Sequence, residues 1–158
     1  MSNNIDMQRF SRSKLEDFMK RCFVATELPE KDAETVARFM AVSDIMGKDS
    51  HGIFRLPGYI QRLINGGINK TPNIKVLKNR TATALVDGDN GMGHLVVNFC
   101  AKLAIKKAKK SGVSWVGVNH STHAGAAGAW SVTTRYEPAA TSDAFPCSSH
   151  CKTSYPRW

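Results

Sequence analysis

The spacing of apolar residues changes at Pro72, and this change constrains the fold more than any other feature of the sequence. Before Pro72, apolar residues in the segments 15–23 and 33–45 recur with the spacing of one helix face. After it, short runs rich in β-branched residues take over, as in strands. The sequence therefore predicts an α/β fold, with an amino-terminal helical part followed by a mixed, largely antiparallel sheet with helices.

The helical part is predicted to hold three helices. Ser13 and Glu16 form a capping-box pattern, which predicts the start of the first helix. The second helix ends at Gly47, because glycine is the usual residue in the left-handed conformation that follows a helix. The third covers 55–67, where Pro57 suits the first turn and a pair of glycines closes the last.

The sheet part begins with two strands. Segments 73–79 and 81–88 are predicted to pair as a hairpin, and 113–120 is predicted to be a buried strand. The glycine-rich run 87–93 predicts a turn, and a helix then continues up to Gly112.

The net charge of +9 raises the possibility of nucleic-acid binding, so the position of the charge matters. Much of it lies in the helix after residue 93, where Lys102, Lys106 and Lys109 recur opposite an apolar side. No aromatic residues alternate with these lysines to stack on bases. We interpret the lysines as a solvated outer face and expect no nucleic-acid partner.

The chain has no run of about 18 apolar residues and no apolar stretch near its start like that of a secretory signal. We therefore expect a soluble, cytoplasmic protein without membrane contact. Four scattered cysteines are too few for a disulfide scaffold. Cys147, His150 and Cys151 offer three ligands in a Ser/Pro-rich segment, a pattern too weak to predict a metal site.

His51, Arg55 and Tyr59 follow one another at steps of four residues just before and within the third helix. An imidazole can exchange a proton near neutral pH, an arginine can bind a carboxylate with two hydrogen bonds, and a phenol can orient a hydroxyl. This set suits a small hydroxy acid. The alternative is structural: a surface loop followed by a helix whose Tyr59 is half-buried.

His123 follows a predicted strand and precedes a Gly/Ala turn, where a helix is expected to start at Gly125 or Ala126. The N–H groups at a helix start lack partners and attract anions, and small residues let a ligand approach the backbone. Contact with an anion or cofactor and tight helix–strand packing explain this turn equally well.

Three blocks, "SDIMGKDSHGIFRLPGYIQRLINGGIN", "TALVDGDNGMG" and "GVNHSTHAGAAG", resemble the malate/L-lactate dehydrogenase family, which also holds ureidoglycolate and diketogulonate reductases. The resemblance covers roughly Gln8 to Trp130. It implies an oxidoreductase that uses NAD or NADP, acts on small 2-hydroxy or 2-keto acids and forms homodimers. The family lacks the G-x-G-x-x-G unit of the Rossmann fold, and so does this chain.

The resemblance also assigns the substrate side of the site. It implies that His51 is the acid/base histidine, with Ser50 beside it, and that Arg55 and Tyr59 contact the substrate. The histidine of the family's second block corresponds to His123, which competes with His51 for the proton-transfer role.

On the cofactor side, the resemblance implies contacts from Ala127, Gly128 and Ala129 in the turn after His123. Two departures from the family are present. Ala124 stands where the family commonly has an aromatic residue, and Ala129 with Trp130 stands where it commonly has an aromatic pair.

The predicted organisation is a helical part at 1–70, a partial cofactor-binding sheet domain at 71–134 and an irregular, divergent tail at 135–158. Because family chains continue well beyond Trp130, we expect a truncated product with an incomplete sheet and little or no turnover of its own. A non-catalytic alternative is a product that binds full-length subunits through its helices.

Overall fold

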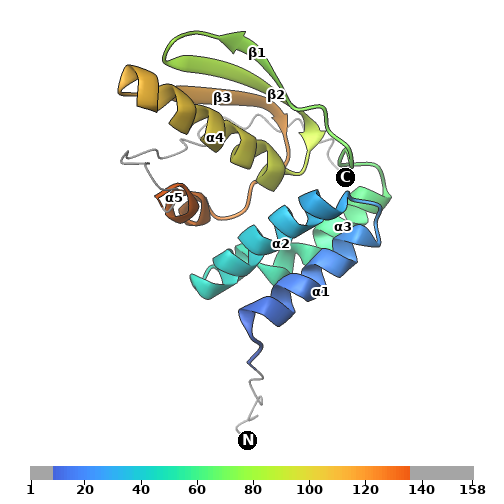
Figure 1. Ribbon diagram of the computed structural model, residues 1–158. Helices are drawn as coiled ribbons and strands as arrows, with labels where there is room; N and C mark the ends of the chain where they lie inside the picture. Colours follow the sequence, from blue (N-terminus) through green and yellow to red (C-terminus); the bar gives the residue numbers. More distant parts are fainter. Residues whose placement is uncertain (1–8, 136–158) are drawn as a thin grey trace, which may run out of the picture.

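The computed structural model describes residues 9–135, and side chains as far as Ser131. Three helices form one part of the molecule, and three strands with α4 form the other, with α5 beside both (Figure 1). The elements are α1 (Arg12–Val24), α2 (Glu30–Ile45), α3 (Leu56–Ile64), β1 (Lys75–Asn79), β2 (Thr83–Gly91), α4 (Gly93–Ser111), β3 (Trp115–Ser121) and α5 (Ala127–Arg135). This order confirms the predicted change from helical to mixed structure.

The three amino-terminal helices lie where the spacing predicted, but the first begins earlier. Ser11 caps α1, and its hydroxyl accepts a hydrogen bond from the Lys14 amide at 3.4 Å. The predicted capping box at Ser13 is therefore wrong, because Ser13 already lies inside the helix. Gly47 follows α2 with φ +67°, as predicted for a residue after a helix.

Two short 3-10 turns, η1 (Asp49–His51) and η2 (Ile53–Arg55), connect α2 to α3. The carboxylate of Asp44 holds this connection, since its Oδ2 accepts a hydrogen bond from the Ile53 amide at 2.9 Å. Pro57 lies in the first turn of α3, as predicted.

The sheet has the order β1-β2-β3 and is mixed, with β1 antiparallel and β3 parallel to β2. The predicted hairpin of 73–79 and 81–88 is confirmed. The predicted turn at 87–93 is wrong, because β2 continues to Gly91 through an irregularity after Asp87. Asp89 accounts for this: its carboxylate accepts hydrogen bonds from the Asn69 side chain and the Asn73 amide, which hold the segment along the strand.

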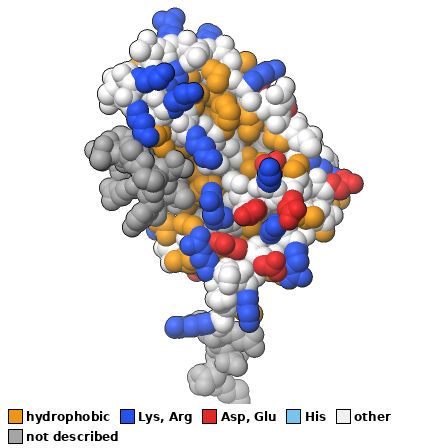
Figure 2. Space-filling model, in the orientation of Figure 1, with side chains coloured by type: hydrophobic (Ala, Val, Ile, Leu, Met, Phe, Trp, Pro, Cys, Tyr) orange, Lys and Arg blue, Asp and Glu red, His pale blue; other side chains and the backbone are white. Residues whose placement is uncertain are grey.

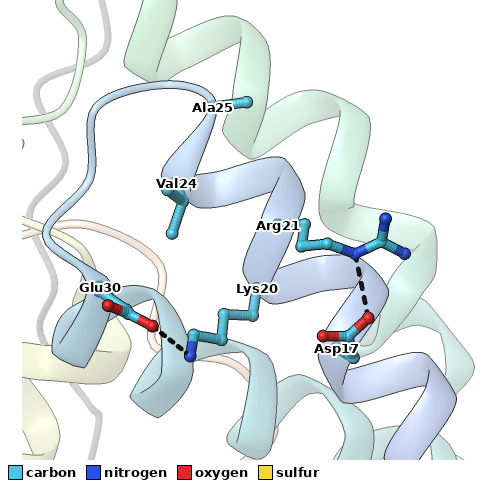
Figure 3. Close-up of a pocket in the computed structure, with 6 residues that line it drawn as sticks. All are labelled: Asp17, Lys20, Arg21, Val24, Ala25 and Glu30. Atoms are coloured by element: carbon cyan, nitrogen blue, oxygen red, sulfur yellow. Dashed lines mark hydrogen bonds and ion pairs between the residues drawn. The ribbon is translucent and has the colours of Figure 1, made fainter.

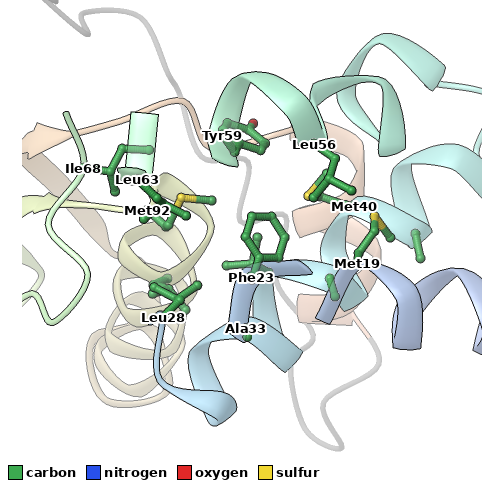
Figure 4. Close-up of a cluster of buried hydrophobic side chains, with 14 residues drawn as sticks. Met19, Phe23, Leu28, Ala33, Met40, Leu56, Tyr59, Leu63, Ile68 and Met92 are labelled. Carbon is green, nitrogen blue, oxygen red and sulfur yellow. The ribbon is translucent and has the colours of Figure 1, made fainter. Parts of the chain in front are cut away.

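One apolar cluster joins the two parts of the molecule. Its centre comes from α1, α2 and α3; Ile68 joins it from the connection between α3 and β1, and Met92 and Leu95 join it from around the start of α4 (Figure 4). A second cluster, with Val86 and Val96 fully buried, lies between α4 and the sheet.

The lysine face of α4 is exposed, as predicted for Lys102, Lys106 and Lys109. Figure 2 shows Lys and Arg side chains gathered over the part of the molecule that contains α4 and the sheet. Lys107 is buried instead, and its ammonium donates to the Asn79 side chain and the Arg80 carbonyl, fixing the hairpin to α4.

The sheet is open. Among the described residues, β1 and β3 each have one edge without a neighbouring strand, and the side chains of β1 are all exposed. The prediction of a buried strand at 113–120 is wrong, because every residue of β3 is exposed or partly exposed and Trp115 is 60% exposed. Most of the apolar stripe of α2, by contrast, is covered by its neighbours in the first cluster, and only Ile45 at the end of the helix is largely exposed. No helix within residues 9–135 is long and apolar enough to cross a membrane.

Candidate active site

The candidate site lies where α3 meets the segment between β3 and α5. Tyr59 on α3 and His123 are 64 positions apart, yet the Tyr59 hydroxyl lies 2.6 Å from His123 Nδ1. Tyr59 is only 4% exposed, because its ring belongs to the apolar cluster, where Figure 4 shows it with Leu56 and Leu63 from the same helix. The core therefore fixes the direction of this phenol.

A second donor at the same nitrogen defines the state of His123. The backbone amide of Gly125 donates to Nδ1 at 3.3 Å, and a backbone N–H can only donate. In the neutral ring the proton therefore lies on Nε2, and the Tyr59 hydroxyl is the donor in its bond to Nδ1.

His51 lies beside this pair, with its ring centroid 5.4 Å from that of His123. Its Nδ1 is 2.9 Å from the hydroxyl of Ser50. The Arg55 Nε donates to the Ser50 carbonyl at 2.8 Å. Ser50 and Arg55 are exposed and His51 is partly exposed, so this half of the site is open to solvent.

The site is rich in positive charge. Burial lowers the pKa of His123 from its usual value, and the charges of Arg55, His51 and Arg62 lower it further, in that order. Arg62 lies three residues after Tyr59 on α3 and was not predicted as a site residue. His123 is therefore neutral near pH 7, and an anion is the ligand that these groups favour.

His94, the second residue of α4, was also missed. Its side chain is fully buried, and its ring meets the Tyr59 ring edge-on with centroids 5.5 Å apart. Burial, with the charges of His123 and His51, lowers the pKa of His94 to about 3. The sequence signal was slight: one titratable residue at the start of an otherwise apolar helix segment.

The predicted cofactor contacts lie at the first turn of α5. Ala127 is exposed, and Gly128 is partly buried beside the Met46 side chain. Ala129 is 1% exposed, and its amide donates to the Ala126 carbonyl at 3.0 Å. Trp130 points back into the protein, where its indole N–H donates to the Ala124 carbonyl at 2.8 Å. The small residues at 127 and 128 leave the start of this helix open to an anionic group.

A surface depression lies elsewhere, between α1 and the start of α2 (Figure 3). Two ion pairs line it, Lys20 with Glu30 at 2.7 Å and Arg21 with Asp17 at 3.0 Å. It contains no predicted site residue. Within the described residues, no group of three His, Cys, Asp or Glu side chains could hold a metal ion, and Cys147 and Cys151 lie outside them.

Comparisons with known proteins find dehydrogenases that are similar to this chain. Malate dehydrogenase of Pyrococcus abyssi is 40% identical over 120 residues, which cover 76% of this chain and 33% of that protein. L-Sulfolactate dehydrogenase of Methanocaldococcus jannaschii is 45% identical over 104 residues, which cover 66% of this chain and 30% of that protein. The chain thus spans about a third of the length of these relatives.

The fold of this chain is also similar to that of a solved dehydrogenase. The structure of malate dehydrogenase from Pyrococcus horikoshii OT3 matches 80% of this chain and 36% of its own, with a TM-score of 0.77 and 38% identity. A sequence model of the malate/L-lactate dehydrogenase family matches residues 10–136, and this chain belongs to that family.

Proposed function

We propose that this chain carries the proton-transfer and substrate-binding part of an oxidoreductase that interconverts small 2-hydroxy and 2-keto acids with NAD or NADP. The observation that carries this proposal is the 2.6 Å contact of the Tyr59 hydroxyl with His123 Nδ1. Oxidation of a hydroxy acid must remove the hydroxyl proton, and this pair offers it a path.

The path runs through Tyr59. As the substrate hydroxyl gives its proton to the Tyr59 oxygen, the phenolic proton moves to His123 Nδ1, and the phenol stays neutral while the ring becomes an imidazolium. The lowered pKa of His123 leaves the ring neutral, and so able to accept the proton, near pH 7. His51 is the competing proton acceptor, because it lies next to His123 and its hydrogen bond to Ser50 is exposed, whereas the bond between His123 and Tyr59 is partly buried.

The substrate is proposed to be a small acid held by Arg55. A guanidinium can bind a carboxylate with two parallel hydrogen bonds. Its Nε already binds the Ser50 carbonyl, which holds the guanidinium beside Ser50 and leaves its remaining N–H groups for a ligand. The relatives are named for malate and sulfolactate, and both names describe 2-hydroxy acids with a second acidic group.

The nicotinamide cofactor would be held in part by the backbone at Ala127 and Gly128, with Ala129 supporting the turn from inside. The accessible start of α5 fits one anionic group of such a cofactor. A bound nicotinamide would exchange the hydride. The chain's own residues orient the acid and handle its proton.

A chimera tests this function, with residues 10–135 replacing the matching segment of the Pyrococcus abyssi malate dehydrogenase. We expect NADH-dependent reduction of oxaloacetate by the chimera. The 158-residue chain alone is expected to show no measurable turnover with NADH and either pyruvate or oxaloacetate. An inactive but folded chimera that binds NADH would contradict the proposed proton path.

A second candidate function is association with longer chains of the same family, as in a homodimer. The covered stripe of α2 does not favour the helices as the contact surface. Exposed apolar residues lie on both parts, with Ile45 and Ile64 on the helices and Leu77 and Trp115 on the strands, so they do not distinguish the two surfaces. The open edges of the sheet favour the sheet as the contact surface. Co-expression with a full-length relative, followed by size analysis, tests this, and a 158-residue chain that always elutes alone would exclude it. For either candidate function, we propose that the protein is located in the cytoplasm.

A further inference from the structure

His94 is the residue at which three segments of the candidate site meet. Its ring contacts Tyr59 of α3 edge-on at an interplanar angle of 89°, and Trp130 of α5 lies 6.2 Å away between ring centroids. A third neighbour is Gly125, where a Cβ would lie only 2.6 Å from His94 Nε2.

The burial of the His94 ring is unusual, because it is a polar side chain in an apolar environment. Among the described residues, neither ring nitrogen has a hydrogen-bond partner, and an unpaired buried polar group costs stability that an apolar residue would not. The ring is neutral near pH 7, so it has no charge to offer there. The shape of the ring therefore explains its presence, because a flat five-membered ring fits between the Tyr59 ring and the Gly125 backbone.

We infer that His94 is a positioning residue of the candidate site, whose ring sets the place of Tyr59 and of the turn at Gly125. Both of these groups donate to His123 Nδ1, at 2.6 and 3.3 Å. A ring that locates both donors thereby fixes the tautomer of His123. The catalytic importance of His94 rests on the proposed function, whereas its effect on the His123 tautomer does not.

Gly125 makes the contact possible. Its φ of +79° lies in the left-handed region that favours glycine, and the missing side chain lets its backbone lie against the His94 ring. Trp130 holds the same turn from the other side through the carbonyl of Ala124. The amide of Gly125 is thus held between two rings.

The first test is an NMR titration of the histidine rings in the 158-residue chain, with 15N shifts reporting the tautomer. We expect His123 in the unaltered chain to be a single Nε2–H tautomer. In His94→Leu we expect a mixture of tautomers, and a His123 pKa that rises by on the order of half a unit. Val96→Ala is the matched control, because Val96 is fully buried on the same helix but packs in the second cluster.

An unchanged His123 in His94→Leu, or an equal change in Val96→Ala, would overturn the inference. If His94→Leu does not fold, a second comparison decides. Gly125→Ala should displace the ring and disturb His123 in the unaltered background. In a His94→Ala background the clash is absent and only the strain of the positive φ remains, so Gly125→Ala should change the His123 pKa clearly less. Additive effects on the His123 pKa would overturn the inference. Neither readout needs substrate or cofactor, so failure here is distinct from failure of the proposed function.

Discussion

The two halves of the candidate site differ in how they are held. Tyr59, His94 and His123 are supported by the apolar cluster and by neighbouring rings, and their geometry is set before any ligand arrives. Ser50 and Arg55 lie on exposed 3-10 turns, fixed mainly by a few polar contacts. The difference indicates that the buried half controls proton transfer, while the exposed half adapts to the acid that binds.

The largest expected effect comes from the buried half. In the chimera, Tyr59→Phe removes the hydroxyl that links substrate and His123 while leaving the ring in the core. Since general acid–base steps contribute on the order of a hundred- to ten-thousandfold, we expect turnover to fall within that range, with little change in KM. A loss below tenfold in steady-state kinetics would assign the proton to His51.

Acid unfolding tests the burial of His94. Its pKa is about 3 when folded and near 6.5 when unfolded, so the unfolded chain binds a proton that the folded one does not between those pH values. The free energy of unfolding should therefore fall as pH drops below 6.5, with His94 contributing about 1.4 kcal/mol per pH unit. Urea unfolding at several pH values should show a shallower dependence in His94→Leu. Val96→Ala should keep the original slope, and equal slopes in all three chains would contradict the burial of a neutral ring.

Removing the positive charge of Arg55 or Arg62 should have a smaller effect, which is a change in the pKa of His123. The positive charges of Arg55 and Arg62 lower the pKa of His123, so removing either charge should raise it. We expect a larger rise for Arg55→Gln than for Arg62→Gln. In NMR titrations of the 158-residue chain, Lys102→Gln serves as a control because Lys102 lies on the outer face of α4. A reversed order would show that Arg62 is nearer to His123 in solution.

The smallest expected effect belongs to Ser50→Ala. It removes the hydroxyl beside His51 Nδ1, which is exposed and can exchange that partner for water. We expect a shift of the His51 ring signals, no shift for His123, and a change in chimera turnover below about tenfold. A change in the tautomer of His123 would mean that the two halves are coupled more closely than their burial indicates.

How far the sequence predicted these features depends on the range of the interactions behind them. The helices and strands followed from local spacing, and Gly47 and Pro57 from local backbone preference. The turn at 87–93 failed because Asp89 bonds to Asn69 and Asn73, contacts that no local pattern reveals.

The site shows the same division. Spacing placed Arg55 and Tyr59 near His51, but only the family resemblance joined them to His123, which is 64 residues from Tyr59. His94 and Arg62 were missed because their importance comes from burial and from charge acting across separate elements. The roles assigned to Ala127, Gly128 and Ala129, and the division at residues 70 and 134, remain predictions.

The cluster that joins the two parts of the molecule also has a consequence for dynamics. Met92 and Leu95 from the α4 end of the sheet part are buried among α1, α2 and α3, so sliding or opening along this boundary would expose the centre of the core. We therefore expect amide hydrogens around Tyr59 and Met92 to exchange together, and only through global unfolding. We expect any faster motion that admits or releases a ligand to occur in the 3-10 turns η1 and η2, the first of which contains His51.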